Sequence, residues 1–116
     1  MHITGPGLRL RIYVGETDHW HGRPLYDALV IRARELGLAG ATVVSGVEGY
    51  GAHSRLHTAK VLRLSENLPM VVELVDREDR IRQFLDECDA MIDGGMVTVE
   101  PVEIVKYSAP REHPTA

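Results

Sequence analysis

The alternation of apolar and polar side chains along the chain predicts most of the secondary structure. Residues 8–14 alternate strictly, which is typical of a strand with one buried face. Residues 24–36 carry an apolar stripe at helical spacing and begin with a proline, which suits the first turn of a helix. Residues 39–47 and 68–75 are rich in valine and predict two further strands, while residues 60–64 are a weaker strand candidate. Neither face of the strand over residues 39–47 is strongly polar, which is typical of a central strand or of one that faces a partner subunit.

A second helix has the clearest period in the chain. We expect Asp76 to cap its N-terminus, with Asp79 at the position that completes a capping box. Gly94 and Gly95 end the helix, and residues 96–107 alternate again as a strand in which Pro101 marks a bulge or a sheet edge. The apolar side of the helix consists of Ile81, Phe84, Leu85, Cys88, Met91 and Ile92.

The predicted order is strand, helix, strand, strand, helix, strand. Two helices on one face of a four-stranded antiparallel sheet form the ferredoxin-like sandwich, which belongs to the α+β fold class. We expect one domain over residues 8–107, which agrees with a length of 116 residues. Residues 1–7 and 108–116 have no apolar period and are expected to be flexible termini. This fold hosts many activities, so it does not indicate a function.

Composition and charge exclude several classes of function. Thirteen basic against seventeen acidic residues give a net charge of -4, which disfavours binding to nucleic acid, because neutralisation of phosphates supplies much of that affinity. The single cysteine, Cys88, excludes a disulfide framework and a cysteine zinc site within one chain. The sequence has no apolar run long enough for a membrane span and no signal-peptide core, so we expect a cytoplasmic protein.

The segment over residues 48–58 is the strongest candidate for function. It joins two predicted strands but is longer than a tight turn, and long loops in small domains are often functional. Glycine amides, hydroxyl groups and the Arg55 guanidinium together suit an anion such as a phosphate. The alternative is an ordinary polar loop in which Tyr50 packs over the core. The residues that would bind an effector here are Gly49, Tyr50, Gly51, His53, Ser54, Arg55, His57 and Thr58.

Histidines occur in two pairs, but we do not expect a metal site. A zinc site needs three or four converging ligands, and nothing in the sequence brings His19 and His21 close to His53 and His57. Trp20 lies in the first polar loop, where it either caps the core or contacts a subunit or ligand.

No catalytic signature is present, so we do not expect an enzyme. Cys88 lies on an apolar helix stripe and is expected to be a small buried hydrophobe. Asp86, Glu87 and Asp89 are explained as a solvated charge run, and no serine has the context of a nucleophile elbow.

Six short motifs together resemble the uncharacterised DUF190 family, which is similar to the PII signalling proteins. The resemblance covers about residues 8–107 and implies a ferredoxin-like subunit that assembles as a homotrimer in the cytoplasm of a bacterium or archaeon. The motifs that carry it are Leu10–Glu16, Gly22–Tyr26, Gly37–Val43, Gly49–Gly51, Ser54–Thr58 and Leu64–Pro69.

The similarity to PII proteins also implies a function. Those proteins are not enzymes; they bind adenine nucleotides in clefts between subunits, and a long loop engages a transporter, channel or enzyme. Residues 49–51 resemble the start of that loop, and Gly95 resembles the second glycine of a Gly-Asp-Gly-Lys turn, which adds Gly94 and Gly95 to the expected effector site. The lysine of that turn is Met96 here and its aspartate is Gly94, and the candidates to replace the missing charges are Arg55, His53, His57 and Lys60.

The sequence therefore predicts a PII-like regulatory protein that binds a small anionic effector, an adenine nucleotide, at clefts between subunits. Its loop over residues 48–58 would engage a partner. Association with the family suggests a membrane transporter or channel of the fluoride-exporter type. One alternative is a trimeric interaction module without a small ligand. The other resembles the CutA proteins and would bind metal through histidines.

Overall fold

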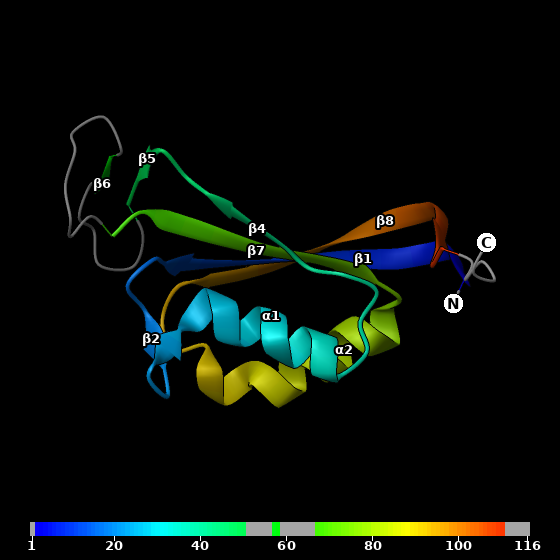
Figure 1. The fold of residues 1–116 in the computed structure, drawn as a ribbon. Helices are drawn as coiled ribbons and strands as arrows, with labels where there is room; N and C mark the ends of the chain where they lie inside the picture. Colours follow the sequence, from blue (N-terminus) through cyan, green and yellow to red (C-terminus); the bar gives the residue numbers. More distant parts are fainter. Residues whose placement is uncertain (1, 51–56, 59–66, 111–116) are drawn as a thin grey trace, which may run out of the picture.

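The computed structural model describes residues 2–50, 57–58 and 67–110. Within these ranges an extended strand opens the chain, two helices alternate with strands, and a second long strand closes it (Figure 1). The elements in chain order are β1 (His2–Gly15), β2 (His19–Trp20), β3 (Arg23–Pro24), α1 (Leu25–Glu35), β4 (Thr42–Ser45), β5 (Glu48–Gly49), β6 (His57–Thr58), β7 (Pro69–Asp76), α2 (Glu78–Cys88), a 3₁₀ turn η1 (Asp89–Met91) and β8 (Met96–Ser108).

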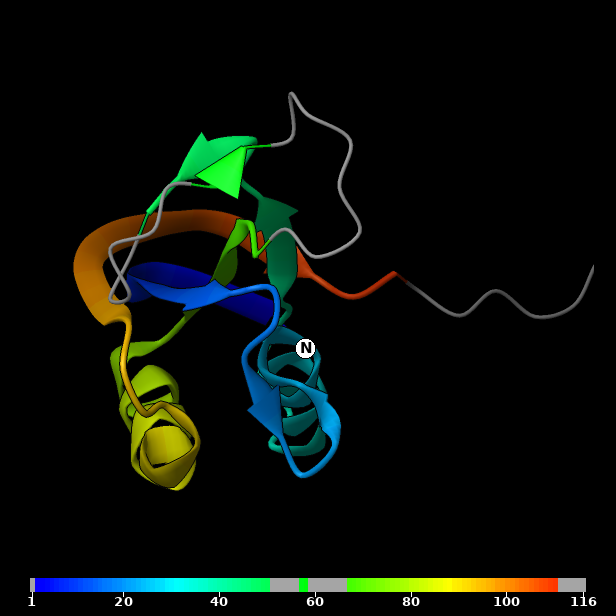
Figure 2. The same cartoon turned by 90° about the vertical axis from the view of Figure 1, so that its left-hand side faces the viewer.

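The main sheet confirms the predicted α+β, ferredoxin-like class. Its four strands are antiparallel and lie in the order β4-β7-β1-β8. Both helices cover one face of this sheet, and the opposite face carries no helix from the described part of the chain (Figures 1 and 2). Two further two-stranded pairs, β2–β3 and β5–β6, stand beside the main sheet.

The core lies between the sheet and the two helices. Alternate residues of β1 and β7 point into it, as the strand pattern predicts. Phe84 is the largest fully buried side chain, and Cys88 is also buried, as expected for the apolar stripe of α2. The buried core consists of Leu8, Leu10, Ile12, Val14, Leu25, Leu29, Ala33, Met70, Val72, Leu74, Ile81, Phe84 and Cys88.

The prediction of a flexible N-terminal lead was wrong for residues 2–7. They form the first part of β1 and pair with β8 as far as Ser108, and Ile3 is buried. The register shifts between Ile3 and Gly5, where Gly5 has a φ of +97°. This bulge interrupts the alternation that reveals strands in a sequence. Pro101 lies on β8, an edge strand of the main sheet, and not at the bulge.

The boundaries of α1 agree with the sequence, whereas both ends of α2 differ: the α-helix ends at Cys88 and continues only as the 3₁₀ turn η1 to Met91, short of Gly94. Gly37 follows α1 with a φ of +75°, which suits a glycine at the end of a helix. Asp76 does not cap α2, because Arg77 occupies the N-cap position and no side chain bonds there. Asp76 instead lies one residue earlier, fully buried at the end of β7.

Candidate functional site

The described parts of the predicted effector site lie at the same end of the sheet. Gly15 at the end of β1 pairs with Pro69 at the start of β7, and Tyr13 pairs with Met96 at the start of β8. Gly49 is close to the same Pro69, since a Cβ on Gly49 would lie 3.2 Å from the proline Cγ. We call this the loop end of the molecule; in Figure 1 it is the end that carries β2, β5 and β6.

The base of the candidate loop is a short β-bridge. Glu48 pairs with Thr58 and Gly49 pairs with His57, so β5 and β6 hold the two sides of the loop together. Tyr50 is 72% exposed and therefore does not pack over the core, which removes that form of the alternative interpretation. The following predicted residues lie outside the described residues: Gly51, His53, Ser54, Arg55 and the strand candidate over 60–64.

The Gly94–Gly95 turn has a steric reason for its glycines. Gly95 has a φ of +94°, and a Cβ there would lie 2.4 Å from the carbonyl oxygen of Tyr13. Gly94 has a φ of +87° but open space around it. The turn therefore needs glycine in order to pass close to β1, whether or not it binds a ligand.

Beside this turn lies a pocket of about 420 Å³ between α2 and the start of β8. Asp86 and Asp89 stand among the residues that line it, together with apolar side chains and the two glycines. Among the described residues, no arginine or lysine lines this pocket. The described side of the turn is thus acidic, and a phosphate there would need cations from another segment or another copy.

An apolar row crosses the helix-free face at the loop end. Val44 of β4 pairs with Val71 of β7, Val71 pairs with Tyr13 of β1, and Tyr13 pairs with Met96 of β8. Directly paired residues share one face of a sheet, so the four side chains form a continuous row. Val44 is 54% exposed and Met96 is 61% exposed. The sequence signal for this row was the absence of a polar face in the strand over residues 39–47.

A compensated group of four charges follows the apolar row on the same face. Arg11 Nε donates to Glu73 at 3.0 Å, and Arg9 Nε donates to Glu100 at 2.7 Å. Longer ion pairs of 3.8 Å join Arg9 to Glu73 and Arg11 to Glu100. The hydrogen bond to Glu73 raises the pKa of Arg11 further above its usual value. Two positive and two negative groups cancel, so this region has no net attraction for an anion.

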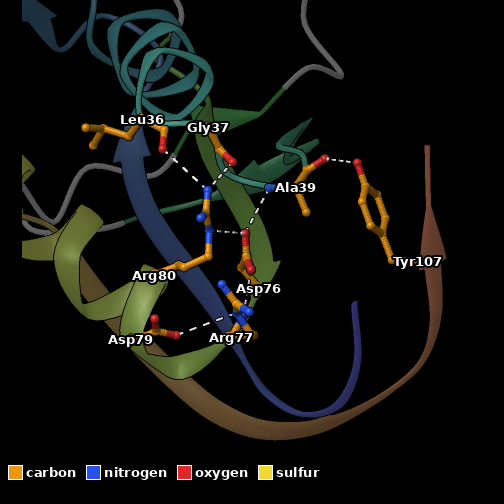
Figure 3. Close-up of polar contacts among 8 residues, drawn as sticks. All are labelled: Leu36, Gly37, Ala39, Asp76, Arg77, Asp79, Arg80 and Tyr107. Atoms are coloured by element: carbon orange, nitrogen blue, oxygen red, sulfur yellow. Dashed lines mark hydrogen bonds and ion pairs between the residues drawn. The ribbon is translucent and has the colours of Figure 1, made fainter. Parts of the chain in front are cut away.

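The opposite end of the sheet is held by a polar cluster, which we call the clasp: Asp76, Arg80, Gly37, Ala39 and Tyr107 (Figure 3). Asp76 Oδ2 accepts hydrogen bonds from the Ala39 amide at 2.9 Å and from Arg80 Nε at 3.3 Å. Arg80 also donates to the Gly37 carbonyl, and the Tyr107 hydroxyl donates to the Ala39 carbonyl at 2.8 Å. The clasp joins α1, β4, β7, α2 and β8, which makes it a structural feature rather than a catalytic one.

The remaining candidates have structural roles. Trp20 packs against the core and stacks on His21, with ring centroids 4.3 Å apart, so it caps the core in this chain. Burial raises the pKa of Cys88 to about 11, which keeps the thiol protonated and a poor nucleophile at neutral pH. Among the described residues no three histidine, cysteine or carboxylate side chains are grouped to hold a metal ion. Within the same ranges no helix has the length and apolar character needed to cross a membrane.

Solved structures with this fold include PII-like proteins and CutA1 proteins. CPII, a nitrogen regulatory PII-like protein from Thiomonas intermedia K12 bound to ADP, AMP and bicarbonate, superimposes with a TM-score of 0.62 and 15% identity. The match covers 85% of this chain and 88% of that one. CutA1 from Oryza sativa gives a TM-score of 0.55 at 16% identity, over 86% of this chain and 83% of that one. At these identities the similarity establishes the PII-like fold alone.

Sequence comparison identifies the family. A UPF0166 protein of Aquifex aeolicus (strain VF5) is 40% identical over 96 residues, which cover 83% of this chain and 90% of the relative. The model of the DUF190 family, described as uncharacterized ACR, matches residues 7–104. The chain therefore belongs to the DUF190 family and has the PII-like fold that its sequence motifs indicate.

Proposed function

We propose that this protein is a PII-like regulator that acts by binding and not by catalysis. Its effector would be a small anion, an adenine nucleotide, held at clefts between subunits, and the loop over residues 48–58 would engage a partner. The observation that carries the proposal is that the loop base at Gly49 and the Gly94–Gly95 turn lie at the same end of the sheet. The ADP and AMP bound to the structurally similar CPII support an adenine nucleotide as the first effector to test.

Charge divides the proposed site into two parts. The described part offers glycines and the carboxylates of Asp86 and Asp89, which repel phosphate. The cations would come from Arg55, with His53 and His57 beside it in the sequence. Effector binding would then bias the loop between two states through contacts that differ between them. The loop thereby couples the effector to the partner, for which a membrane transporter or channel is the candidate.

The helix-free sheet face supports assembly into a homotrimer. The row of Val44, Val71, Tyr13 and Met96 is apolar and partly exposed, and the neighbouring four charges compensate one another within the chain. Burial of such a face against other copies removes apolar surface from water without leaving a net charge buried. β4 is an edge strand, so its apolar outer face agrees with a strand that faces a partner subunit.

One observation favours a second candidate, an interaction module without a small ligand. The described part of the loop end displays exposed apolar side chains and carboxylates, including Tyr50 and Val47, and no described cation joins them. Such a surface suits protein contact as well as it suits a nucleotide cleft.

A thermal-shift and calorimetry series distinguishes these candidates. We expect ATP, ADP or AMP to raise the melting temperature by several degrees, because a ligand at a hundredfold excess over its Kd adds about 2.7 kcal/mol of stability. Arg55→Ala should abolish the shift while leaving the unliganded midpoint unchanged. The matched control is Arg34→Ala, which removes an exposed arginine from α1. If no nucleotide changes the melting temperature, the interaction module without a small ligand becomes the favoured candidate. A response to copper or zinc that is lost when His53 and His57 are replaced would replace the proposal with a metal-binding one.

A further inference from the structure

The pocket between α2 and the start of β8 has the features of a docking site for a basic protein segment. Its walls are apolar: Leu85 and Ile92 border it from the helical side and Val97 from the strand. Val97 pairs with Ile12, which is fully buried on the helix-facing side of the sheet, yet Val97 itself is 38% exposed. The helices therefore leave the helix-facing side of β8 partly uncovered at this point, and the gap is the pocket.

Two carboxylates give the pocket its charge. Asp86 and Asp89 border it, and neither forms an ion pair with any residue in the described part of the chain. Their neighbour Glu87 differs, because it accepts a hydrogen bond from Arg32 at 2.8 Å. The sequence predicts that Asp86, Glu87 and Asp89 are equally solvated. In the structure Glu87 is instead paired with Arg32 of α1, whereas Asp86 and Asp89 border the pocket without a described cation beside them.

The position of these carboxylates is unfavourable in the isolated chain. They lie at the C-terminal end of α2, where the helix dipole is already negative and the helix's own last turn holds no basic residue. They are also three residues apart, a spacing that places like charges side by side on a helix surface. Two carboxylates that repel each other and the helix dipole lower stability, and such an unfavourable arrangement is typical of a position that serves a function.

We propose that this pocket binds an arginine or lysine side chain from a basic segment of a partner protein. The long side chain of arginine or lysine has an apolar stem and a cationic head, which match the apolar walls and the carboxylates respectively. The cation also offsets the electrostatic repulsion between Asp86 and Asp89. Part of the binding energy therefore comes from loss of a repulsion that is present in the free protein. A volume of about 420 Å³ accommodates such a side chain. The pocket shares its two glycines and two carboxylates with the described part of the proposed effector site, whose cation would be Arg55.

The test uses the full-length ¹⁵N-labelled chain and a synthetic hexapeptide, acetyl-Ala-Leu-Arg-Leu-Arg-Ala-amide. We expect saturable amide shifts at Leu85, Gly94 and Gly95, and none with the peptide in which glutamate replaces arginine. The double variant Asp86→Asn/Asp89→Asn should bind the peptide about tenfold more weakly, which corresponds to two surface ion pairs. The matched control is Glu78→Gln/Asp79→Asn, which removes the same charge from the other end of the same helix and should bind like the original chain.

Several results would overturn the proposal. Equal peptide affinity in the two double variants would show that only net charge matters, and the absence of shifts at the pocket would show that nothing docks there. A change of oligomeric state in Asp86→Asn/Asp89→Asn, measured by size exclusion, would assign the pocket to a contact between copies instead. Nucleotide binding measured on the same samples separates the two proposals, because it depends on Arg55: Arg55→Ala should lose nucleotide binding and keep its affinity for the peptide. The pocket variant should also unfold at the same temperature as the original chain or a higher one, since it removes a repulsion.

Discussion

The two ends of the sheet differ in how far their side chains are buried and hydrogen-bonded. At the clasp end, Asp76 is fully buried and each of its oxygens accepts a hydrogen bond, so that one carboxylate ties two helix ends to the sheet. At the loop end, Tyr50, Val44 and Met96 are exposed, and the chain turns through glycines. The clasp end is thus tightly bonded, and the surfaces that stay open to a ligand or partner lie at the other end, where we propose that binding takes place.

Removal of the clasp carboxylate should have the largest effect. Asp76→Ala leaves the Arg80 guanidinium and the Ala39 amide without their acceptor, and removal of one member of a buried ion pair costs about 3–5 kcal/mol. Urea denaturation followed by circular dichroism measures this loss. The control is Glu87→Ala, which breaks an exposed pair with Arg32 and should cost less than about 1 kcal/mol. Equal losses in the two variants would contradict the contrast between the ends.

Substitution of a glycine at the loop end should cause the second largest loss of stability. Gly95→Ala combines a φ of +94° with a Cβ placed 2.4 Å from the Tyr13 carbonyl oxygen, so β1 and the turn must move apart. Gly94→Ala has a φ of +87° with free space, and its cost is limited to about 1–2 kcal/mol for the left-handed backbone. We expect Gly95→Ala to be the more destabilising of the two by chemical denaturation. The reverse order would show that the turn does not pass β1 as described.

The sequence predicted the strands and helices better than the polar contacts between them. Strict alternation located β1 and β7, and the helical period located α2, because these patterns follow directly from burial of one face. The clasp was missed, since an aspartate before a helix has the same appearance in a sequence whether it caps that helix or accepts bonds from a distant loop. The division among Asp86, Glu87 and Asp89 was also missed, because it depends on where Arg32 of α1 lies, which only the packing of the helices determines.

Within the clasp, removal of the Tyr107 hydroxyl should cause a smaller loss of stability. Tyr107→Phe removes the bond to the Ala39 carbonyl at 2.8 Å and keeps the ring, so the expected loss is about 1 kcal/mol. The matched control is Tyr50→Phe, whose side chain is exposed at the loop end and should leave the unfolding free energy unchanged. Thermal unfolding of both variants measures the difference. A loss in Tyr50→Phe as large as that in Tyr107→Phe would mean that the loop end is as tightly built as the clasp.

The smallest effect at neutral pH should come from Cys88, the last residue of α2. Burial raises its pKa from 9.0 to about 11, so the folded chain holds the thiol proton more tightly than the unfolded chain does. This contribution is fully present below pH 9 and is lost as the pH rises towards 11, because the unfolded thiol ionises first. The unfolding free energy of the original chain should therefore fall relative to that of Cys88→Ala between these pH values. Parallel curves would show that the thiol has the same pKa in both states, and that α2 does not seal the core where it approaches the loop end.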